Sequence, residues 1–258
     1  MRTIYLIILL IFITLIAGCI GENKSQDFKD DLLWEHAIEA GTVSISPNGE
    51  YIFMITAPSI YIEQKSGNIL FNSSYDLLLF NRNGDILWSQ KFEVENTNEI
   101  TQFNAFIRED NILLTTAKTT YIFNIVGKLI KKTETVANDV SLQISEDGSY
   151  VDSKNKNISV FDNRNNKKWE YKIDDNLYIN SVIISNDGRY VFASTRGAKY
   201  AWADSIVGIY VFDMQGNLIR KYTAIQYPAP MAISDDGRYL VVGADKLYLF
   251  EINKGKSH

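Results

Sequence analysis

The chain has 258 residues, of which 46% are hydrophobic and 22% charged, so it holds enough apolar material to bury a sizeable core. Its 26 lysines and arginines against 31 aspartates and glutamates give a net charge of −5, which argues against a nucleic-acid partner. One cysteine and two histidines, one of them C-terminal, leave few parts for disulfides, transition-metal sites or Cys/His catalysis.

The N-terminal segment predicts where the protein is located. Arg2 precedes an almost wholly apolar stretch over residues 3–16, which is typical of a signal peptide. The sequence Leu15-Ile16-Ala17-Gly18-Cys19 follows it and resembles the lipobox of prokaryotic lipoproteins. This resemblance implies that Cys19 becomes the lipid-modified first residue of the mature protein.

Three segments follow from this interpretation. We expect a lipoprotein signal peptide over residues 1–18, a polar tether over residues 19–31 and a domain over residues 32–258. The domain would then be held by lipid on the outer side of the cytoplasmic membrane. The alternative is an uncleaved anchor, because the apolar stretch over residues 3–20 just reaches the length needed to span a bilayer.

Two short phrases recur along the rest of the chain. The first is Ser-x-(Asn/Asp)-Gly-x-Tyr, and the second ends in Phe followed by Asn, Asp or Glu. Recurrences about 40–50 residues apart, with strand-like content, are the sequence signature of a β-propeller. The first phrase occurs at 46–51, 145–150, 185–190 and 234–239, and the second at 79–81, 122–124, 160–162, 211–213 and 249–251.

Superposing the units predicts four strands in each of them. In the fourth unit we expect these strands over residues 180–184, 189–194, 208–213 and 217–223. The second unit has lost its first phrase, and Arg108-Glu109-Asp110-Asn111 stands in that place. The fifth unit lacks a fourth strand, whereas residues 32–38 form an unassigned strand before the first unit. We therefore expect an all-β propeller of five four-stranded antiparallel blades, closed by the N-terminal strand; six blades with one degenerate unit is the alternative.

Three tryptophans occupy the same position of the fourth strand. They are Trp34, Trp88 and Trp169, and we expect them to pack between neighbouring blades.

The repeats resemble the WD40-like repeats of TolB-type and quinoprotein-like (PQQ-like) propellers. The phrases at 185–190 and 234–239 match most closely, and the resemblance covers residues 32–251. It implies a propeller architecture without naming a ligand. The quinoprotein members imply redox activity, which we keep as a lesser alternative because tryptophan recurs in only some units.

The variable connections predict one functional face. The longest are residues 57–75 and 195–208, and three others carry distinctive side chains, at 94–101, 174–178 and 224–230. In a four-stranded blade all of these lie at the same end, and loops on a rigid scaffold commonly carry function. Candidate binding residues are Tyr61, Tyr178, Arg196, Tyr200, Trp202, Asp204 and Tyr227. Trp202 has an alternative interpretation, in which it plugs the ring or packs over the next blade.

The chain offers no convincing catalytic constellation, so we expect a non-enzymatic module that binds a protein or a surface glycan. The alternative is a carbohydrate-binding or carbohydrate-cleaving propeller, which needs paired carboxylates. The expected inner strands contain no acid, so that chemistry would depend on Asp174, Asp175 and Asp204. Asp235-Asp236-Gly237 is better explained as a hairpin turn than as a calcium loop, and we expect no cofactor and no metal.

Overall fold

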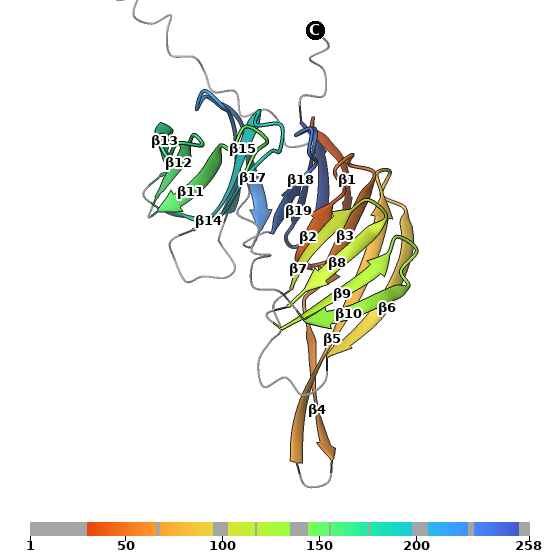
Figure 1. Cartoon of the computed structure of the whole chain (residues 1–258). Helices are drawn as coiled ribbons and strands as arrows, with labels where there is room; N and C mark the ends of the chain where they lie inside the picture. The colour runs from red at the N-terminus through yellow and green to blue at the C-terminus, as the bar shows by residue number, and fades with distance from the viewer. Residues whose placement is uncertain are drawn as a thin grey trace, which may run out of the picture.

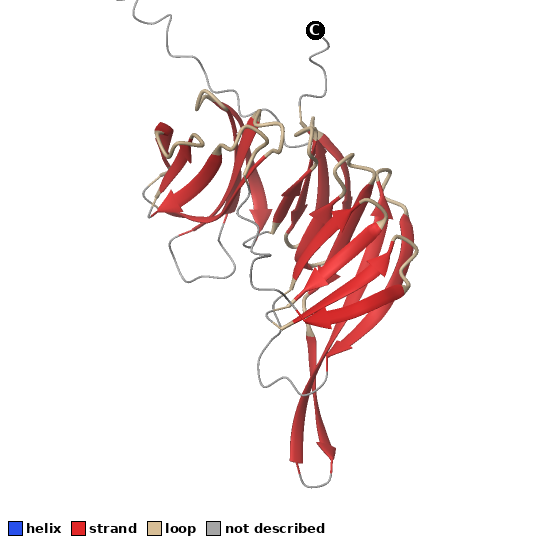
Figure 2. Ribbon diagram, in the orientation of Figure 1, coloured by secondary structure: helices blue, strands red, loops and turns tan. Residues whose placement is uncertain are grey.

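The computed structural model describes residues 30–65, 68–94, 103–116, 118–134, 144–154, 156–174, 176–197, 206–226 and 230–252. Within these residues the chain is all β and contains no helix (Figures 1 and 2). Its strands form five antiparallel sheets arranged as the blades of a propeller, which confirms the predicted fold class.

The blades follow one another along the chain. Blade 1 consists of β2 (Ala40–Ile45), β3 (Tyr51–Thr56), β5 (Asn68–Asn81) and β6 (Ile86–Val94), with β4 (Ser59–Lys65) paired to β5. Blade 2 consists of β7 (Asn104–Arg108), β8 (Asn111–Thr115), β9 (Thr119–Asn124) and β10 (Leu129–Glu134). Blade 3 consists of β11 (Tyr150–Lys154), β12 (Asn157–Phe161) and β13 (Lys167–Lys172). Blade 4 consists of β14 (Leu177–Ile184), β15 (Tyr190–Gly197), β16 (Ile206–Asp213) and β17 (Leu218–Gln226). Blade 5 consists of β18 (Met231–Ile233), β19 (Tyr239–Gly243), β20 (Leu247–Glu251) and β1 (Leu32–His36).

The N-terminal strand completes the last blade, as predicted. β1 pairs antiparallel with β20, and the backbone N–H of Glu251 donates to the carbonyl of Asp31 at 2.8 Å. Asp31 is 1% exposed and accepts hydrogen bonds from Tyr222 Oη at 2.6 Å and Arg220 Nε at 3.2 Å, both on β17 of blade 4. The first described residues therefore join blade 5 to blade 4 as well as closing the sheet of blade 5.

Only three strands of blade 3 lie in the described part of the chain. The expected inner strand over residues 140–144 falls mostly outside it, because residues 135–143 are not described. Ile144, the last of these positions, forms an isolated bridge with Tyr150.

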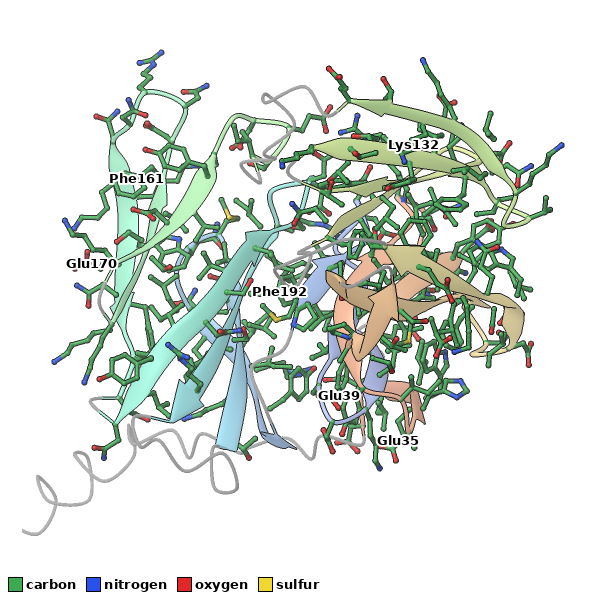
Figure 3. All side chains as sticks on the ribbon, turned by 90° about the horizontal axis from the view of Figure 1, so that it is seen from below. Glu35, Glu39, Lys132, Phe161, Glu170 and Phe192 are labelled. Atoms are coloured by element: carbon green, nitrogen blue, oxygen red, sulfur yellow. The ribbon has the colours of Figure 1, made fainter. Side chains whose placement is uncertain are left out.

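Hydrophobic clusters fill four junctions between blades. Each is built from residues of two adjacent blades: 4 with 5, 5 with 1, 1 with 2, and 3 with 4. Among the described residues no such cluster joins blades 2 and 3, whose sheets are marked by Lys132 and Phe161 in Figure 3. In the described part of the chain, the core is thus a series of apolar layers at four of the junctions between blades.

The recurring tryptophans explain how neighbouring blades are aligned. Each indole lies against a positive-φ glycine in the β-turn of the next blade and donates to a carbonyl of that turn. The pairs are Trp34 with Gly84 and the Arg82 carbonyl, Trp88 with Gly127 and the Ile125 carbonyl, and Trp169 with Gly216 and the Met214 carbonyl. The prediction of inter-blade packing is confirmed for all three.

The junction between blades 2 and 3 lacks both members of this pair. Lys131 stands where blades 1, 3 and 5 have tryptophan, and Asn165, with φ of 65°, stands in place of the glycine. Asparagine is one of the few residues that tolerates this backbone region when no ring has to pack against it. The sequence therefore changes on both sides of the same junction.

The Ser-x-(Asn/Asp)-Gly-x-Tyr phrase builds the turn from the first to the second strand of a blade. In blade 4, Ser185 Oγ donates to Asp187 Oδ1 at 2.7 Å and accepts from the backbone N–H of Tyr190 at 3.0 Å. Gly188 has φ of 67°, which glycine adopts without a steric penalty. Blades 1 and 5 repeat the two serine hydrogen bonds, so the phrase is a self-contained turn.

The expected loop over residues 57–75 is instead a two-stranded ribbon, which corrects the sequence interpretation. β4 pairs with β5 from Ser59 opposite Ser74 to Lys65 opposite Asn68. Figure 1 shows this ribbon projecting beyond the blades at the bottom of the view. The strand β5 is 14 residues long because it serves both the blade and the ribbon.

Candidate functional site

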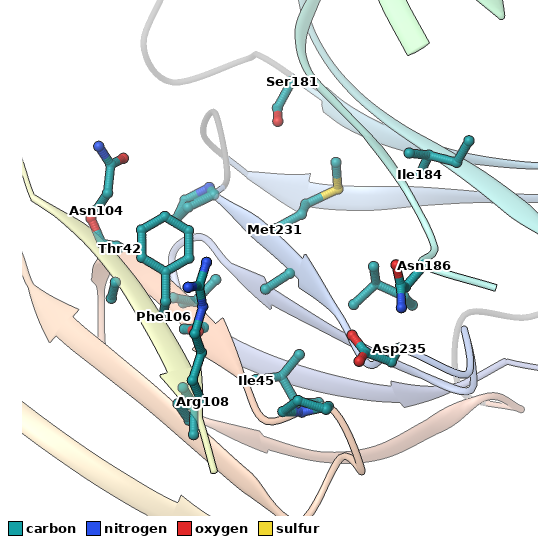
Figure 4. Close-up of a pocket in the computed structure, with 18 of the residues that line it drawn as sticks. Thr42, Ile45, Asn104, Phe106, Arg108, Ser181, Ile184, Asn186, Met231 and Asp235 are labelled. Atoms are coloured by element: carbon teal, nitrogen blue, oxygen red, sulfur yellow. The ribbon is translucent and has the colours of Figure 1, made fainter. Parts of the chain in front are cut away.

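A cavity of about 600 Å³ lies between the inner strands of the blades (Figure 4). Its walls come from β2, β7, β14 and β18, together with the turn residues that follow three of these strands. These inner strands neighbour one another around the ring in the order β14, β18, β2 and β7. The cavity therefore occupies the central channel of the propeller.

Few polar side chains converge on this channel. Arg108 ends β7, and its side chain extends into the cavity beside Phe106, whereas Asp235 and Asn186 enter from the turns of blades 5 and 4 (Figure 4). Within the described part of the chain, Arg108 forms no ion pair or hydrogen bond with another side chain. The channel thus presents one cation, one carboxylate and amide groups to a small polar ligand.

The turns that carry these residues are held by backbone hydrogen bonds from blade to blade. The N–H of Asp235 donates to the Pro47 carbonyl at 2.9 Å, and the N–H of Asp187 donates to the Asp235 carbonyl at 3.1 Å. The N–H of Glu146 donates to the Asn186 carbonyl at 2.7 Å. In blades 1, 4 and 5 the second position of the Ser-x-(Asn/Asp)-Gly phrase, at Pro47, Asn186 and Asp235, lines the channel.

Asp235 has a carboxyl group with a raised pKa. Burial raises it first, and the negative charges of Asp236 and Asp187 raise it further. Asp235 is also the one acid among the described residues that line the cavity. Glycoside cleavage needs two facing carboxyl groups, and the described walls of the channel do not supply a pair.

Two residues of the predicted site lie directly opposite each other. Tyr178 on β14 pairs with Arg196 on β15, at the end of blade 4 where the long connections emerge. Tyr178 is 46% exposed, and Lys156 Nζ lies 5.8 Å from the centre of its ring. An exposed aromatic ring beside two cations is suited to contacting a partner or a sugar.

The other predicted residues are divided between the ribbon and parts of the chain outside the described residues. Tyr61 lies on β4, where it pairs with Asn72. Tyr200, Trp202, Asp204 and Tyr227 lie outside the described residues, as does Asp175. Asp174 is described, and its carboxylate lies 3.7 Å from Lys221 Nζ in an exposed ion pair.

The channel residues are not apparent from the repeat phrases, because Arg108 belongs to a lost turn phrase and Asp235 to a hairpin turn. The signal that identifies them is their position in the repeat: Arg108 is the last residue of its inner strand, and Asp235 lies two residues beyond the end of β18. Among the described residues no group of three or more His, Cys, Asp or Glu side chains is placed to hold a metal ion, and no described helix could cross a membrane.

Comparison with known proteins identifies no family for this chain. No family model matches the chain, and no curated protein matches its sequence. Two similar solved structures are the Pan2 WD40 domain of Neurospora crassa and the hydrazine synthase of Kuenenia stuttgartiensis. Each is 12% identical with a TM-score of 0.31, covering 85% and 87% of this chain and 91% and 77% of the respective structures. The propeller assignment rests on the order and closure of the sheets themselves.

Proposed function

We propose that this protein is a lipid-tethered, extracytoplasmic binding module without enzymatic activity, which engages a protein partner or a surface polymer through its ribbon end. The observation that carries this proposal is the ribbon of β4 and the first part of β5. Among the described residues, which end at Val94 on this strand, β6 pairs with β5 only from Ser73 onward, and residues 68–72 pair with β4. A two-stranded ribbon of this kind is marginally stable by itself, and here it is supported by the blade that continues it.

The ribbon offers two kinds of recognition. A strand with an unpaired edge can accept an extended segment of a partner by adding a further strand. Paired positions on the ribbon also carry large side chains, with Ile62 opposite Phe71 and Tyr61 opposite Asn72. Tyr178 and Arg196 stand at the same end of the molecule, on blade 4. Backbone pairing would give affinity, and these side chains would give specificity.

Shortening the ribbon is expected to abolish binding without unfolding the propeller. Residues 60–73 would be replaced by Asn-Gly, a pair that favours a tight hairpin turn. We expect crosslinked capture of the partner from native membranes to fall by roughly 30-fold, since interface anchors each contribute about 2 kcal/mol or more.

The matched control changes the opposite end of the molecule. In that variant Asn163 and Arg164, two exposed residues of the blade 3 turn, become Gly-Ser. Capture by this control should equal that of the intact protein. Equal capture by the ribbon variant, with an unchanged melting curve, would contradict the proposed face.

The proposed location has its own test. Changing Cys19 to serine should remove the attached lipid and the cleaved form together, because the sulfur accepts the lipid. Metabolic labelling with a fatty acid and the mass of the protein in the membrane fraction measure both. A processed, lipid-labelled Cys19→Ser protein would rule out this attachment site.

A further inference from the structure

Most of the exposed apolar side chains gather in one place. Of the large hydrophobic residues that are exposed in the described part of the chain, five belong to the outer strands of blades 1 and 2 (β6 and β10) or to the turn between β9 and β10. They are Ile86, Leu87, Val126, Leu129 and Ile130, with exposed fractions of 46–71%. We call these five residues the rim patch. Contiguous exposed apolar surface commonly marks an interaction site.

Contacts between the blades bring the turn of blade 2 close to the blade 1 part of the patch. Val126 is at the tip of the turn between β9 and β10, and its neighbour Gly127 lies against Trp88 of β6. Trp88 Nε1 also donates to the carbonyl of Ile125 at 2.8 Å. The turn of blade 2 therefore rests on β6, two residues from Ile86.

The patch lies at the end of the propeller where the chain enters. β1 begins at Leu32, and Trp34 donates to the Arg82 carbonyl at 2.8 Å and packs on Gly84. The turn that contains Arg82 and Gly84 leads directly into Ile86. Strands alternate in direction within a blade, so this end is opposite the ribbon.

The length of the segment before β1 limits how far the entry end can lie from the membrane. The segment between the apolar stretch at 3–20 and the first described residues is only about ten residues long. Fully extended it would reach about 35 Å, whereas a folded domain of this size is roughly 40–45 Å across. A membrane tether would hold the entry end, and not the ribbon end, near the bilayer.

The character of the exposed side chains distinguishes the rim patch from the rest of the entry end. The exposed Lys128 and Lys131 flank it on blade 2, and anionic headgroups attract such lysines. The turns of all five blades at this end include acids, and those of blades 3, 4 and 5 also carry Arg164, Lys168, Arg189 and Arg238. The exposed apolar side chains, more than the charges, therefore favour a tilt of the domain onto blades 1 and 2.

We propose that the rim patch rests in the interfacial layer of the membrane that holds the tether, with the ribbon directed away from the lipid. This inference depends on the membrane tether of the proposed function, and it adds an orientation to it. Apolar side chains flanked by lysines are the composition by which surface segments enter the headgroup region. The partner-binding end would thereby be displayed outward.

Spin labels placed at single cysteines test the orientation. The lipid-modified protein would be purified from membranes with Cys19 in place, because its sulfur carries the lipid and leaves the added cysteine as the one free thiol. One protein carries Val126→Cys and the matched control carries Lys118→Cys, an exposed position in the turn between β8 and β9 at the ribbon end. Both would be reconstituted in vesicles of phosphatidylcholine with a minor fraction of phosphatidylglycerol.

The accessibility of each label to oxygen and to a water-soluble nickel complex gives its depth. We expect the label at Val126 about 5–10 Å inside the headgroup boundary, the depth of interfacial apolar groups, and the label at Lys118 in water. Ile130→Cys provides a second reporter and should report the same layer as Val126.

The other outcomes distinguish a failure of the proposed orientation from a failure of the membrane tether. Protein that floats with the vesicles but has water-exposed labels at Val126 and Ile130 would overturn the orientation and leave the proposed location intact. Spin–spin broadening at Val126 would identify a second copy of the chain as the occupant and overturn it as well. Protein that does not float would refute the membrane tether and the orientation together.

Discussion

Replacing Asp31 with alanine is expected to lower the free energy of unfolding by about 3–5 kcal/mol, the cost of removing one partner from a buried ion pair. Asp31 accepts from Arg220 and Tyr222 of blade 4 while its own backbone holds β20, so one residue links the closing strand to two blades. Its loss leaves the Arg220 guanidinium, 15% exposed, without its carboxylate. Urea unfolding followed by tryptophan fluorescence measures the change.

A neighbouring ion pair gives the control for this substitution. Glu35 on the same strand accepts from Lys246 at 2.6 Å, but both side chains are largely in solvent. Exposed pairs contribute about 0–1 kcal/mol, so Glu35→Ala should change the unfolding free energy little. If Asp31→Ala were as mild as Glu35→Ala, the closing strand would not secure the ring as described.

Changing Gly216 to valine is expected to destabilise the propeller by about 2–5 kcal/mol. The backbone there has φ of 86°, which costs an L-residue about 1–2 kcal/mol. A Cβ atom would also lie 2.9 Å from Cγ of Trp169, and overpacking of this kind costs about 1–3 kcal/mol. Thermal unfolding monitored by near-UV circular dichroism would show the shift.

The equivalent turn of blade 3 provides the comparison. Asn165 already adopts φ of 65°, and the preceding blade places Lys131 where blades 1, 3 and 5 have tryptophan. Asn165→Gly should therefore change stability by less than about 0.5 kcal/mol, as for most surface substitutions. A Gly216→Val protein as stable as Asn165→Gly would show that the indole can leave the turn at no cost.

Much of this architecture could be predicted from the sequence because its turns are local. The Ser-x-(Asn/Asp)-Gly phrase supplies its own hydrogen bonds and its own positive-φ residue, so each copy specifies a turn without help from the rest of the chain. The closing strand could be predicted for another reason: its Trp34 stands at the position that Trp88 and Trp169 occupy in their blades. Because these local signals recur in successive units, they predict a closed ring of blades.

The ribbon could not be predicted because it has no counterpart in the other units. The length of residues 57–75 favours a loop. The Ser-Gly pair at 66–67 separates two apolar runs, which is typical of a hairpin. Whether such a pair folds back on itself depends on the blade that extends β5, a tertiary effect. The ribbon occurs in one unit only, so no other copy in the sequence could be compared with it.

The channel residues were missed because they occur where the repeat is irregular. Arg108 takes its place in the channel through the one unit that has lost its turn phrase, and Glu109 beside it adopts φ of 50° without glycine. The free position within the phrase is occupied by Pro47, Glu146, Asn186 and Asp235 in turn. This position varies from copy to copy and is therefore not part of the repeat pattern, yet in blades 1, 4 and 5 its residue lines the channel.

The central claim is that the ribbon end of the propeller binds a partner, and photo-crosslinking in intact cells tests it most directly. A benzophenone amino acid at Tyr61 of the ribbon should yield a specific adduct with one partner, whereas the same probe at Asn163, in a turn at the opposite end, should yield none. Adducts from Asn163 but not from Tyr61 would contradict the claim and assign binding to the entry end of the propeller.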